Sequence, residues 1–317
     1  MKIYLAPMEG LLDHFLRKIL TEMGGYDLCV SEFIRINQHL LSDSSILQVV
    51  PELKNKSRTS SGIPVKVQIL GSDPVCMAEN ADKIAKLGAY GIDLNFGCPA
   101  PTVNRNRGGA ILLKEPDLLF QIVQSVRKAV PKEIPVTSKM RLGYESKDLA
   151  IESALALEAG GLEEVVVHAR TKVDGYKPPA YWEWIAKIKA HLRIPVIANG
   201  EIWDVESANR CKIVSGCENI MIGRGAISNP NLANQIRAND SKRLDWNQVV
   251  SLLQNFVEDM ESNSKHVHSS GRVKQWLKYL AREYPEAKHG FELSKKITKS
   301  FQILENLKGM NLSELVG

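Results

Sequence analysis

The sequence predicts a (β/α)8 barrel, the TIM-barrel form of the α/β class, followed by a small all-helical domain. Three observations support this fold. Short apolar segments rich in β-branched residues recur eight times between residues 3 and 223. Most gaps between them carry the apolar spacing of amphipathic helices. After Pro230 only helical patterns remain. Eight alternating β and α units are typical of a barrel, which takes about 250 residues.

The expected strands are apolar nearly throughout, as parallel strands buried on both faces are. They cover residues 3–7, 28–32, 65–70, 92–95, 136–141, 164–168, 196–199 and 219–223. Helical patterns between them cover residues 78–87, 116–130, 149–159 and 205–213, and three more cover residues 246–260, 273–283 and 291–307. We therefore expect a catalytic barrel over residues 1–238, a polar linker at residues 238–245 and a helical domain over residues 246–317.

Composition and charge exclude several classes of protein. The 317 residues include 41 Lys and Arg against 36 Asp and Glu, and this mild excess is compatible with nucleic-acid binding. No stretch approaches the roughly 18 apolar residues of a membrane span, and residues 1–10 lack a signal peptide's apolar region. We expect a cytoplasmic protein without membrane association.

The five cysteines are scattered along the chain and odd in number, which favours free thiols over a disulfide framework. Cys211 and Cys217 lack a matching His or Cys pair, so no metal site is expected.

Several expected strands end in a polar residue of a different type. These residues are Glu32, Gln68, Asn95, Lys139, His168 and Asn199. The carboxyl ends of barrel strands face the active site. One polar strand end could be a solvated cap, but so many types on one rim predict a catalytic mouth.

The most specific segment runs from Asp93 to Pro99 and is followed by a glycine pair at residues 108–109. Cys98 lies in the loop after a predicted strand, from which a thiol can reach a substrate in the mouth. Pro99 stiffens this loop and the glycines permit close approach. A buried structural thiol is the commonest fate of a free cysteine, so Cys98 alone does not decide.

Further motifs follow the other strand ends in order. They are Ala6–Gly10, Ser138–Gly143, Val167–Thr171, Ile197–Ile202 and Met221–Ala226. With the Cys98 loop, they make the chain resemble the tRNA-dihydrouridine synthases over essentially its whole length. The resemblance implies reduction of the C5=C6 bond of a tRNA uridine, with NADPH as reductant, flavin hydride transfer to C6 and proton donation to C5 by Cys98. A free thiol with a pKa of about 8.5 is mostly protonated at neutral pH, as this role requires.

The residues also favour flavin mononucleotide (FMN) on physical grounds. Barrel phosphate sites commonly lie after strands 7 and 8, where Gly200, Gly223 and Arg224 occur. Lys139 would face the isoalloxazine edge that gains negative charge on reduction. Gln68 would bind the pyrimidine edge, unless it is only a satisfied strand-end amide. The expected cofactor residues are Pro7, Met8, Glu9, Gln68, Lys139, His168, Asn199, Gly200, Glu201, Gly223 and Arg224.

The C-terminal region predicts an RNA surface. Residues 263–282 contain no Asp or Glu but carry Lys265, His266, His268, Arg272, Lys274, Trp276, Lys278, Tyr279 and Arg282. Basic side chains favour phosphates and aromatic rings stack on unpaired bases, although a solvated helix face is the alternative. The expected RNA-binding residues are Arg35, Asn95, Arg170, Tyr176, Arg272, Lys274 and Tyr279. Segments 32–35 and 272–277 look most like the bacterial subgroup that modifies uridine 16 of the D-loop.

Two segments depart from the family pattern. Residues 105–107 are Arg-Asn-Arg where small residues are usual, and Asp174 stands where Gln is usual. Two other functions stay open: a flavin oxidoreductase acting on a small pyrimidine, like dihydroorotate or dihydropyrimidine dehydrogenases, and a catalytically silent RNA-binding module. The basic segment argues against the first, and Lys139 with Cys98 argues against the second. We expect tRNA as partner, no obligate protein partner and a monomer.

Overall fold

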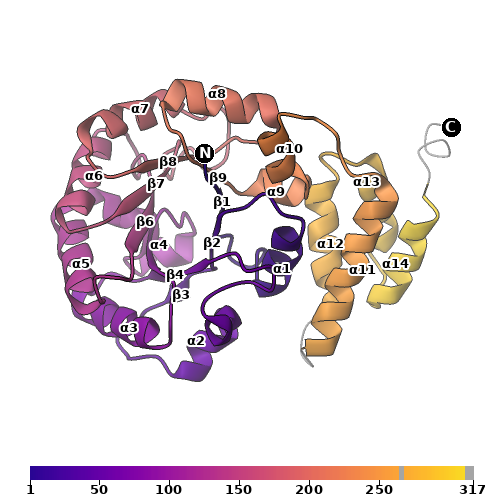
Figure 1. The fold of residues 1–317 in the computed structure, drawn as a ribbon, viewed down its shortest axis with the longest axis horizontal. Coiled ribbons are helices and arrows are strands. Elements are labelled where there is room, and N and C mark those ends of the chain that lie inside the picture. Colours follow the sequence, from indigo (N-terminus) through magenta and orange to yellow (C-terminus); the bar gives the residue numbers. More distant parts are fainter. Residues whose placement is uncertain (264–267, 311–317) are drawn as a thin grey trace.

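The computed structural model describes residues 1–263 and 268–310 and confirms the predicted barrel. Its strands form one parallel sheet in the order β2-β1-β9-β8-β7-β6-β5-β4-β3, which closes because β2 also pairs with β4. The strands are β1 (Ile3–Leu5), β2 (Leu28–Val30), β3 (Ile34–Arg35), β4 (Val65–Leu70), β5 (Ile92–Phe96), β6 (Val136–Arg141), β7 (Glu164–His168), β8 (Val196–Asn199) and β9 (Ile220–Ile222). Figure 1 shows the barrel within a ring of helices.

All eight predicted strands occur, but three are shorter than expected. Pro7, Glu32 and Gly223 leave the ladder because the chain turns there into the rim loops. Strand β3 was not predicted, and its two residues pair with the end of β4 outside the closed ring.

The helices of residues 1–238 mostly cover the outside of the barrel, but Figure 1 shows the short α4 (Pro101–Arg105) inside their ring. They are α1 (His14–Glu22), α2 (Asp43–Val49), α3 (Pro74–Lys86), α4 (Pro101–Arg105), α5 (Pro116–Ala129), α6 (Ala150–Ala159), α7 (Trp182–His191), α8 (Val205–Ser215), α9 (Arg224–Ser228) and α10 (Leu232–Ala238), with 3-10 turns η1 (Pro51–Asn55) and η2 (Gly109–Lys114). The predicted helices correspond to α3, α5, α6 and α8. The helix α1 was missed, although Phe15, Leu16, Ile19 and Leu20 have helical spacing and are buried.

Residues of the strands alternate between the two faces of the barrel wall. In β5, Ile92, Leu94 and Phe96 belong to the outer core that packs on the helices. Asp93 and Asn95 therefore point into the barrel. The inner apolar layer is small and consists of Tyr4, Ala6, Leu28, Val30, Val166, Ile197 and Met221. The interior above this layer is available to polar side chains.

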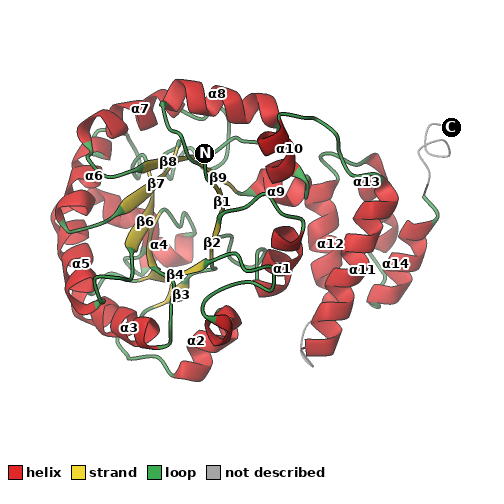
Figure 2. Ribbon diagram, in the orientation of Figure 1, coloured by secondary structure: helices red, strands yellow, loops and turns green. Residues whose placement is uncertain are grey.

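The C-terminal residues fold as a helical bundle of α11 (Trp246–Asn263), α12 (Ser269–Leu280), α13 (Pro285–Ser294) and α14 (Ser300–Lys308). Figure 2 shows these helices on one side of the barrel. The single helix expected over residues 291–307 is wrong. The chain turns back after Ser294, and Gly290 of α13 lies so close to Leu307 of α14 that a Cβ would be 2.3 Å from Leu307 Cδ2. Among the described residues, no helix is long and apolar enough to cross a membrane.

The bundle docks on the barrel through α11 and α12. Helix α11 packs on α1, and α12 packs on α9. Trp276 is buried at this seam, where its Nε1 donates a hydrogen bond to the carbonyl of Ile227 (3.0 Å) and its ring meets Phe256 edge-on at 5.2 Å. Lys18 pairs with Asp259 at 2.8 Å. The division at residues 238–246 stays a proposal, since the two parts share this packed seam.

Arg272 anchors the same seam rather than facing solvent. Its guanidinium donates to the carbonyls of Gly10 (2.8 Å) and Leu11 (2.7 Å) and pairs with Asp13 (2.8 Å). Only 17 % of its side chain is exposed. Its role in RNA binding stays a prediction: Gly10, Leu11 and Asp13 occupy its two Nη groups, while its buried Nε has no hydrogen-bond partner among the described residues.

Arg272→Ala should destabilise the protein by about 2 to 3 kcal/mol, because charged hydrogen bonds are lost and buried carbonyls are left unpaired. Lys274→Ala is the matched control, since Lys274 Nζ donates only to the carbonyl of Lys295 at 3.2 Å. Urea unfolding of both variants measures the difference. Equal stabilities would contradict the anchoring role.

Candidate active site

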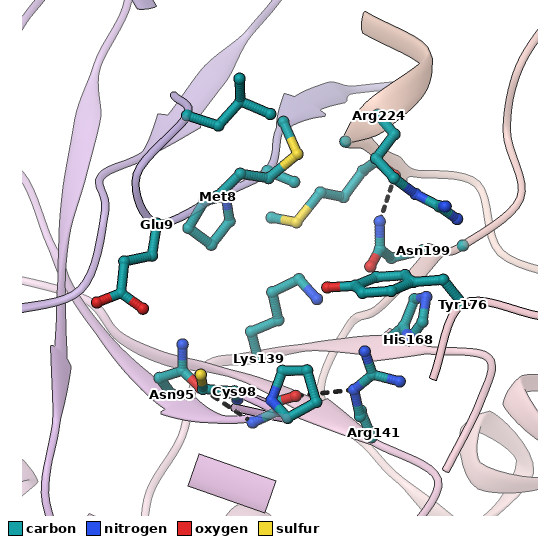
Figure 3. A pocket seen from close by; sticks show the side chains of 18 of the residues that line it. Met8, Glu9, Asn95, Cys98, Lys139, Arg141, His168, Tyr176, Asn199 and Arg224 are labelled. Carbon is teal, nitrogen blue, oxygen red and sulfur yellow. Dashed lines mark hydrogen bonds between the residues drawn. The ribbon is translucent and has the colours of Figure 1, made fainter. Parts of the chain in front are cut away.

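A cavity of about 670 Å³ opens at the carboxyl ends of the strands. Cys98 and every residue expected to bind the cofactor line it, as do Asn95, Tyr176 and Tyr279 from the expected RNA set. Gln275 and Tyr279 reach it from α12, so the helical bundle forms part of the wall. Figure 3 shows Lys139 near the middle, with Cys98 and Asn95 on one side and His168, Asn199 and Arg224 on the other. The roles of these residues remain predictions.

Lys139 projects from β6 into the cavity. Its register partner on β5 is Asn95, and none of the described carboxylates lies within ion-pair distance of its ammonium group. Burial, and then the charge of Arg141, lowers the pKa of Lys139 to about 7. A cation without a counter-ion at the floor of a cavity favours an electron-rich ligand there.

The loop that carries Cys98 is held by hydrogen bonds at both ends. Asn95 Oδ1 accepts from the backbone amides of Gly97 (3.0 Å) and Cys98 (2.5 Å). The Cys98 carbonyl accepts from Ala110 N (3.0 Å) and Asn104 Nδ2 (3.1 Å). Burial raises the pKa of the Cys98 thiol, although the charges of Arg141 and Arg35 work against it. The thiol therefore stays protonated at neutral pH, as an acid must.

The opposite end of the cavity is formed by the loops after β8 and β9. Arg224 lies between the rings of Tyr176 (4.5 Å) and Trp203 (4.9 Å) and lies 3.8 Å from Glu201. The two loops touch at Gly225, where a Cβ would come within 2.2 Å of the Ile202 carbonyl. Only glycine permits this contact. The loops thus bring backbone and a guanidinium to one place, which suits a phosphate.

Glu201 acts within the protein, because it pairs with Arg170 and accepts from Trp203 Nε1 at 2.9 Å. Burial works to raise the pKa of Glu201, but the hydrogen bonds from Arg170 and Trp203 and the charges of both arginines lower it overall. Its carboxylate therefore fixes Arg224 and the loop after β8 rather than offering a free acid.

His168 lines the cavity as a neutral ring. Burial lowers its pKa well below the usual value, and the nearby charges of Arg141 and Lys139 lower it further. Its buried Nδ1 has no hydrogen-bond partner among the described residues. A buried polar atom without a partner is costly, so this nitrogen favours a ligand that completes it.

Three predicted ligand contacts involve side chains that hydrogen-bond to protein groups in this structure, and their roles stay predictions. Arg170 is fully buried and donates to the carbonyls of Lys177 (2.7 Å) and Pro179 (3.2 Å), while its buried Nη1 has no hydrogen-bond partner among the described residues. Asn95 uses its oxygen to cap the Cys98 loop. Gln68 donates to Asp93 (2.6 Å) and accepts from Asn95 (2.8 Å), but it also lines the cavity, so the satisfied amide and the cofactor contact both stay open.

The other expected RNA residues vary in position. Tyr176 is 51 % exposed at the mouth, and its ring lies 5.2 Å from the Arg141 guanidinium. Arg35 lies on β3 and Lys274 on α12, both outside the cavity lining. Lys265 and His266 lie outside the described residues.

Both departures from the family pattern have a local structural role. Asp174 accepts from Thr171 N (2.7 Å) and donates its own amide to Thr171 Oγ1 (3.2 Å), which closes the turn leading to Tyr176. Arg107 has a left-handed backbone and makes a bidentate pair with Glu115 at 2.9 and 2.7 Å. The charged loop is thereby ordered.

Two residues of the site escaped the sequence analysis. Arg141 donates to the carbonyls of Gly97 (2.8 Å), Thr171 and Gly175 (both 2.9 Å), and so holds the loop after β5 and the loop after β7 at the end of β6. Its place at the end of a polar strand was a usable signal. Trp203 stacks on Arg224, and nothing in the local sequence indicates this. Among the described residues, no group of three or more His, Cys, Asp or Glu side chains could hold a metal ion.

Comparison with known proteins agrees with this geometry. The family model described as dihydrouridine synthase (Dus) matches residues 4–314. The chain belongs to the dihydrouridine synthase family. A tRNA-dihydrouridine(16) synthase of Pseudomonas putida is 55 % identical over 291 residues, 90 % of each chain. One from Escherichia coli O157:H7 is 44 % identical over 316 residues, 99 % of this chain and 100 % of that one.

Among solved structures, an old yellow enzyme homologue from Zymomonas mobilis is similar in fold. It has a TM-score of 0.55 and 13 % identity, and the match covers 77 % of this chain and 90 % of that chain. At this identity the likeness concerns the fold alone. The assignment to the family therefore rests on sequence comparison, and the barrel architecture is supported independently by comparison of structures.

Lys139→Met should stabilise the cofactor-free protein at pH 7. The lowered pKa means that the unfolded chain binds more protons between pH 7 and 10, so wild-type stability rises with pH in this window. The advantage of the methionine should shrink by at most about 1.4 kcal/mol per pH unit. Urea unfolding at pH 7, 8 and 9 measures this difference, and parallel curves for the two proteins would contradict it.

Proposed function

We propose that this chain reduces the C5=C6 bond of uridine 16 in the tRNA D-loop to 5,6-dihydrouridine, with FMN as bound cofactor and NADPH as reductant. The observation that carries the proposal is one cavity holding a protonated thiol, an unpaired lysine and a loop pair suited to phosphate. Relatives of similar length are named tRNA-dihydrouridine(16) synthases.

The residues present fit an FMN. Arg224 and the backbone at Gly200 and Gly223 would hold the phosphate, and Lys139 would lie against the electron-rich edge of the ring system. The unpartnered His168 Nδ1 adds a polar contact between these two ends. When bound, the flavin supplies the hydride that reduces C6 of the uracil ring.

Cys98 would donate the proton to C5. Hydrogen bonds to Asn95, Asn104 and Ala110 fix the backbone of its loop, and this holds the sulfur in one position at the cavity wall. Burial keeps the sulfur protonated. A thiol that is already protonated can donate its proton without a second residue that changes its protonation state first.

The rim would hold the RNA. Tyr176 and Tyr279 offer aromatic faces at the mouth. Lys274 and Lys278 lie on the same helix as Tyr279, α12, and their ammonium groups contact the Lys295 carbonyl and the Phe291 ring at α13. A uridine in folded tRNA must leave its stack to enter a cavity, which costs a few kcal/mol. Contacts remote from the base offset this cost.

The two alternative functions fit less well. A silent RNA-binding module has no use for a buried unpaired lysine, which is costly to retain. A small-pyrimidine reductase would not need a basic helix such as α12 to supply part of the cavity wall. We further propose that the protein acts as a monomer in the cytoplasm, where tRNA is found.

The direct test incubates the purified protein with FMN, NADPH and an unmodified tRNA transcript. We expect dihydrouridine at position 16, and none in a transcript with cytidine there. Replacing NADPH by NADH tests the reductant. If the transcript with cytidine 16 gains as much dihydrouridine as the parent transcript, the proposed position is wrong.

Cys98→Ala should leave the fold and FMN binding intact but slow uridine reduction by about 100 to 10,000-fold, the usual contribution of a positioned acid. Cys76→Ala is the matched control, because Cys76 lies on α3 and does not line the cavity. Rapid-mixing measurement of a single turnover gives the rate of uridine reduction in each of the two variants. A native rate in Cys98→Ala would exclude Cys98 as the acid.

Lys274→Ala combined with Lys278→Ala should weaken tRNA binding and flatten its salt dependence, each lost phosphate contact lowering the log-log slope by about 0.7 to 0.9. Lys128 and Lys132 are the control pair, since Lys128 lies in the last turn of α5 and Lys132 follows that helix, before the amino end of β6 and so at the opposite rim. Titrations at several salt concentrations compare the variants. Superimposable curves for wild type and Lys274/Lys278 variant would mean that α12 is only a solvated face.

A further inference from the structure

A chain of four buried side chains runs through the barrel interior to the Cys98 loop. We call Thr137, Asp93, Gln68 and Asn95 the Asp93 relay. Thr137 Oγ1 donates to Asp93 Oδ1 (2.7 Å), and Gln68 Nε2 donates to Asp93 Oδ2 (2.6 Å). Asn95 Nδ2 donates to Gln68 Oε1 (2.8 Å), and Asn95 Oδ1 receives the amides of Gly97 and Cys98. The relay thus links three neighbouring strands to the loop.

The hydrogen bonds of the relay all run in one direction, from donor to acceptor toward Asp93. The Asp93 end and the loop end of the relay both require this direction. A carboxylate accepts hydrogen bonds only, so Asp93 requires the amide nitrogen of Gln68 to face it. Gln68 then presents its oxygen to Asn95, which must answer with nitrogen. This leaves the oxygen of Asn95 for the two loop amides. Those amides are donors, so the loop demands the arrangement that Asp93 enforces from the other side.

Burial makes a mismatch in the relay expensive. The four side chains are between 0 and 8 % exposed, so water does not replace a lost partner freely. A buried polar group without a partner destabilises the arrangement that leaves it unpaired. Burial raises the pKa of Asp93, but a proton on Oδ1 would face the Thr137 hydroxyl and leave Oδ2 as acceptor. The direction is the same in both protonation states.

We propose that Asp93 is a positioning residue for Cys98. Its side chain points into the barrel interior and does not line the cavity. Its carboxylate nevertheless sets which way Gln68 and Asn95 turn, and through them the loop that presents the thiol. The consequence for uridine reduction rests on the proposed function. The effect on the loop does not.

A double-mutant cycle between positions 93 and 95 tests the direction itself. In Asn95→Asp, two carboxylates face the two ends of Gln68, which can donate to only one of them. In Asp93→Asn alone, the amide oxygen can still face Gln68 while its nitrogen faces Thr137. In the double variant the relay can run in reverse. The new amide at position 93 then donates to Gln68, Gln68 donates to the new carboxylate at position 95, and that carboxylate still accepts from the loop amides.

The primary readout is hydrogen exchange of the Gly97 and Cys98 amides in the cofactor-free protein. This exchange reports on the hydrogen bonds of the loop and not on the ionisation of the thiol. We expect Asn95→Asp to speed this exchange at least about tenfold, Asp93→Asn to change it little, and the double variant to return it to near the Asp93→Asn rate. Single-turnover uridine reduction should fall about 100-fold in Asn95→Asp, as for a catalytic group displaced by about 1 Å, and recover partly in the double variant.

Thr137→Val is the matched control, because it removes a donor to Asp93 but leaves the amide groups of Gln68 and Asn95 free to keep their orientation. It should leave exchange at Cys98 unchanged. Additive effects of the two substitutions, or a double variant as impaired as Asn95→Asp, would overturn the proposal, and so would failure of both to fold. A wild-type protein that makes no dihydrouridine would refute the proposed function, while the exchange cycle would still decide the role of Asp93.

Discussion

The closed ladder of parallel strands is the constraint on which the site depends. Closure forces alternate residues of every strand inward and gathers all carboxyl ends on one rim. The β5–β6 register then sets Asn95 opposite Lys139, so the Cys98 loop and the lysine enter the same cavity from neighbouring strands. A buried cation without a partner is costly, and a bound electron-rich ligand can supply the missing partner.

The helical bundle completes the cavity rather than standing apart from it. Trp276 and Arg272 lock α12 to the barrel, and the same helix sends Gln275 and Tyr279 into the cavity wall. Stability and access are therefore linked at one seam. A change that loosens the seam would also displace part of the surface proposed for tRNA.

The sequence was sufficient to predict the eight strands of the closed barrel, because short continuous apolar segments rich in β-branched residues are typical of buried parallel strands. It was also sufficient for the location of the site, since residues at strand ends must share a rim. It was insufficient for β3, which has only two residues, and for the turn between α13 and α14, which depends on contact between Gly290 and Leu307.

The sequence was also insufficient for the partners of charged and amide groups. Arg272 looks like an RNA contact in a basic context, but its acceptors at Gly10 and Leu11 are distant along the chain. Arg170 pairs with Glu201 from the loop after the next strand. Asn95 and Gln68 line the cavity as ligand contacts would, and they also hydrogen-bond in a chain that leads to the buried carboxylate of Asp93. The direction of an amide depends on all its neighbours, and no spacing in the sequence records it.

The most direct measurement of the central claim is a map of dihydrouridine in tRNA from cells that lack this protein. The account predicts that dihydrouridine at position 16 disappears, that other dihydrouridine positions persist, and that the wild-type gene restores position 16 while the Cys98→Ala gene does not. An unchanged map, or loss at another position with position 16 intact, would contradict it.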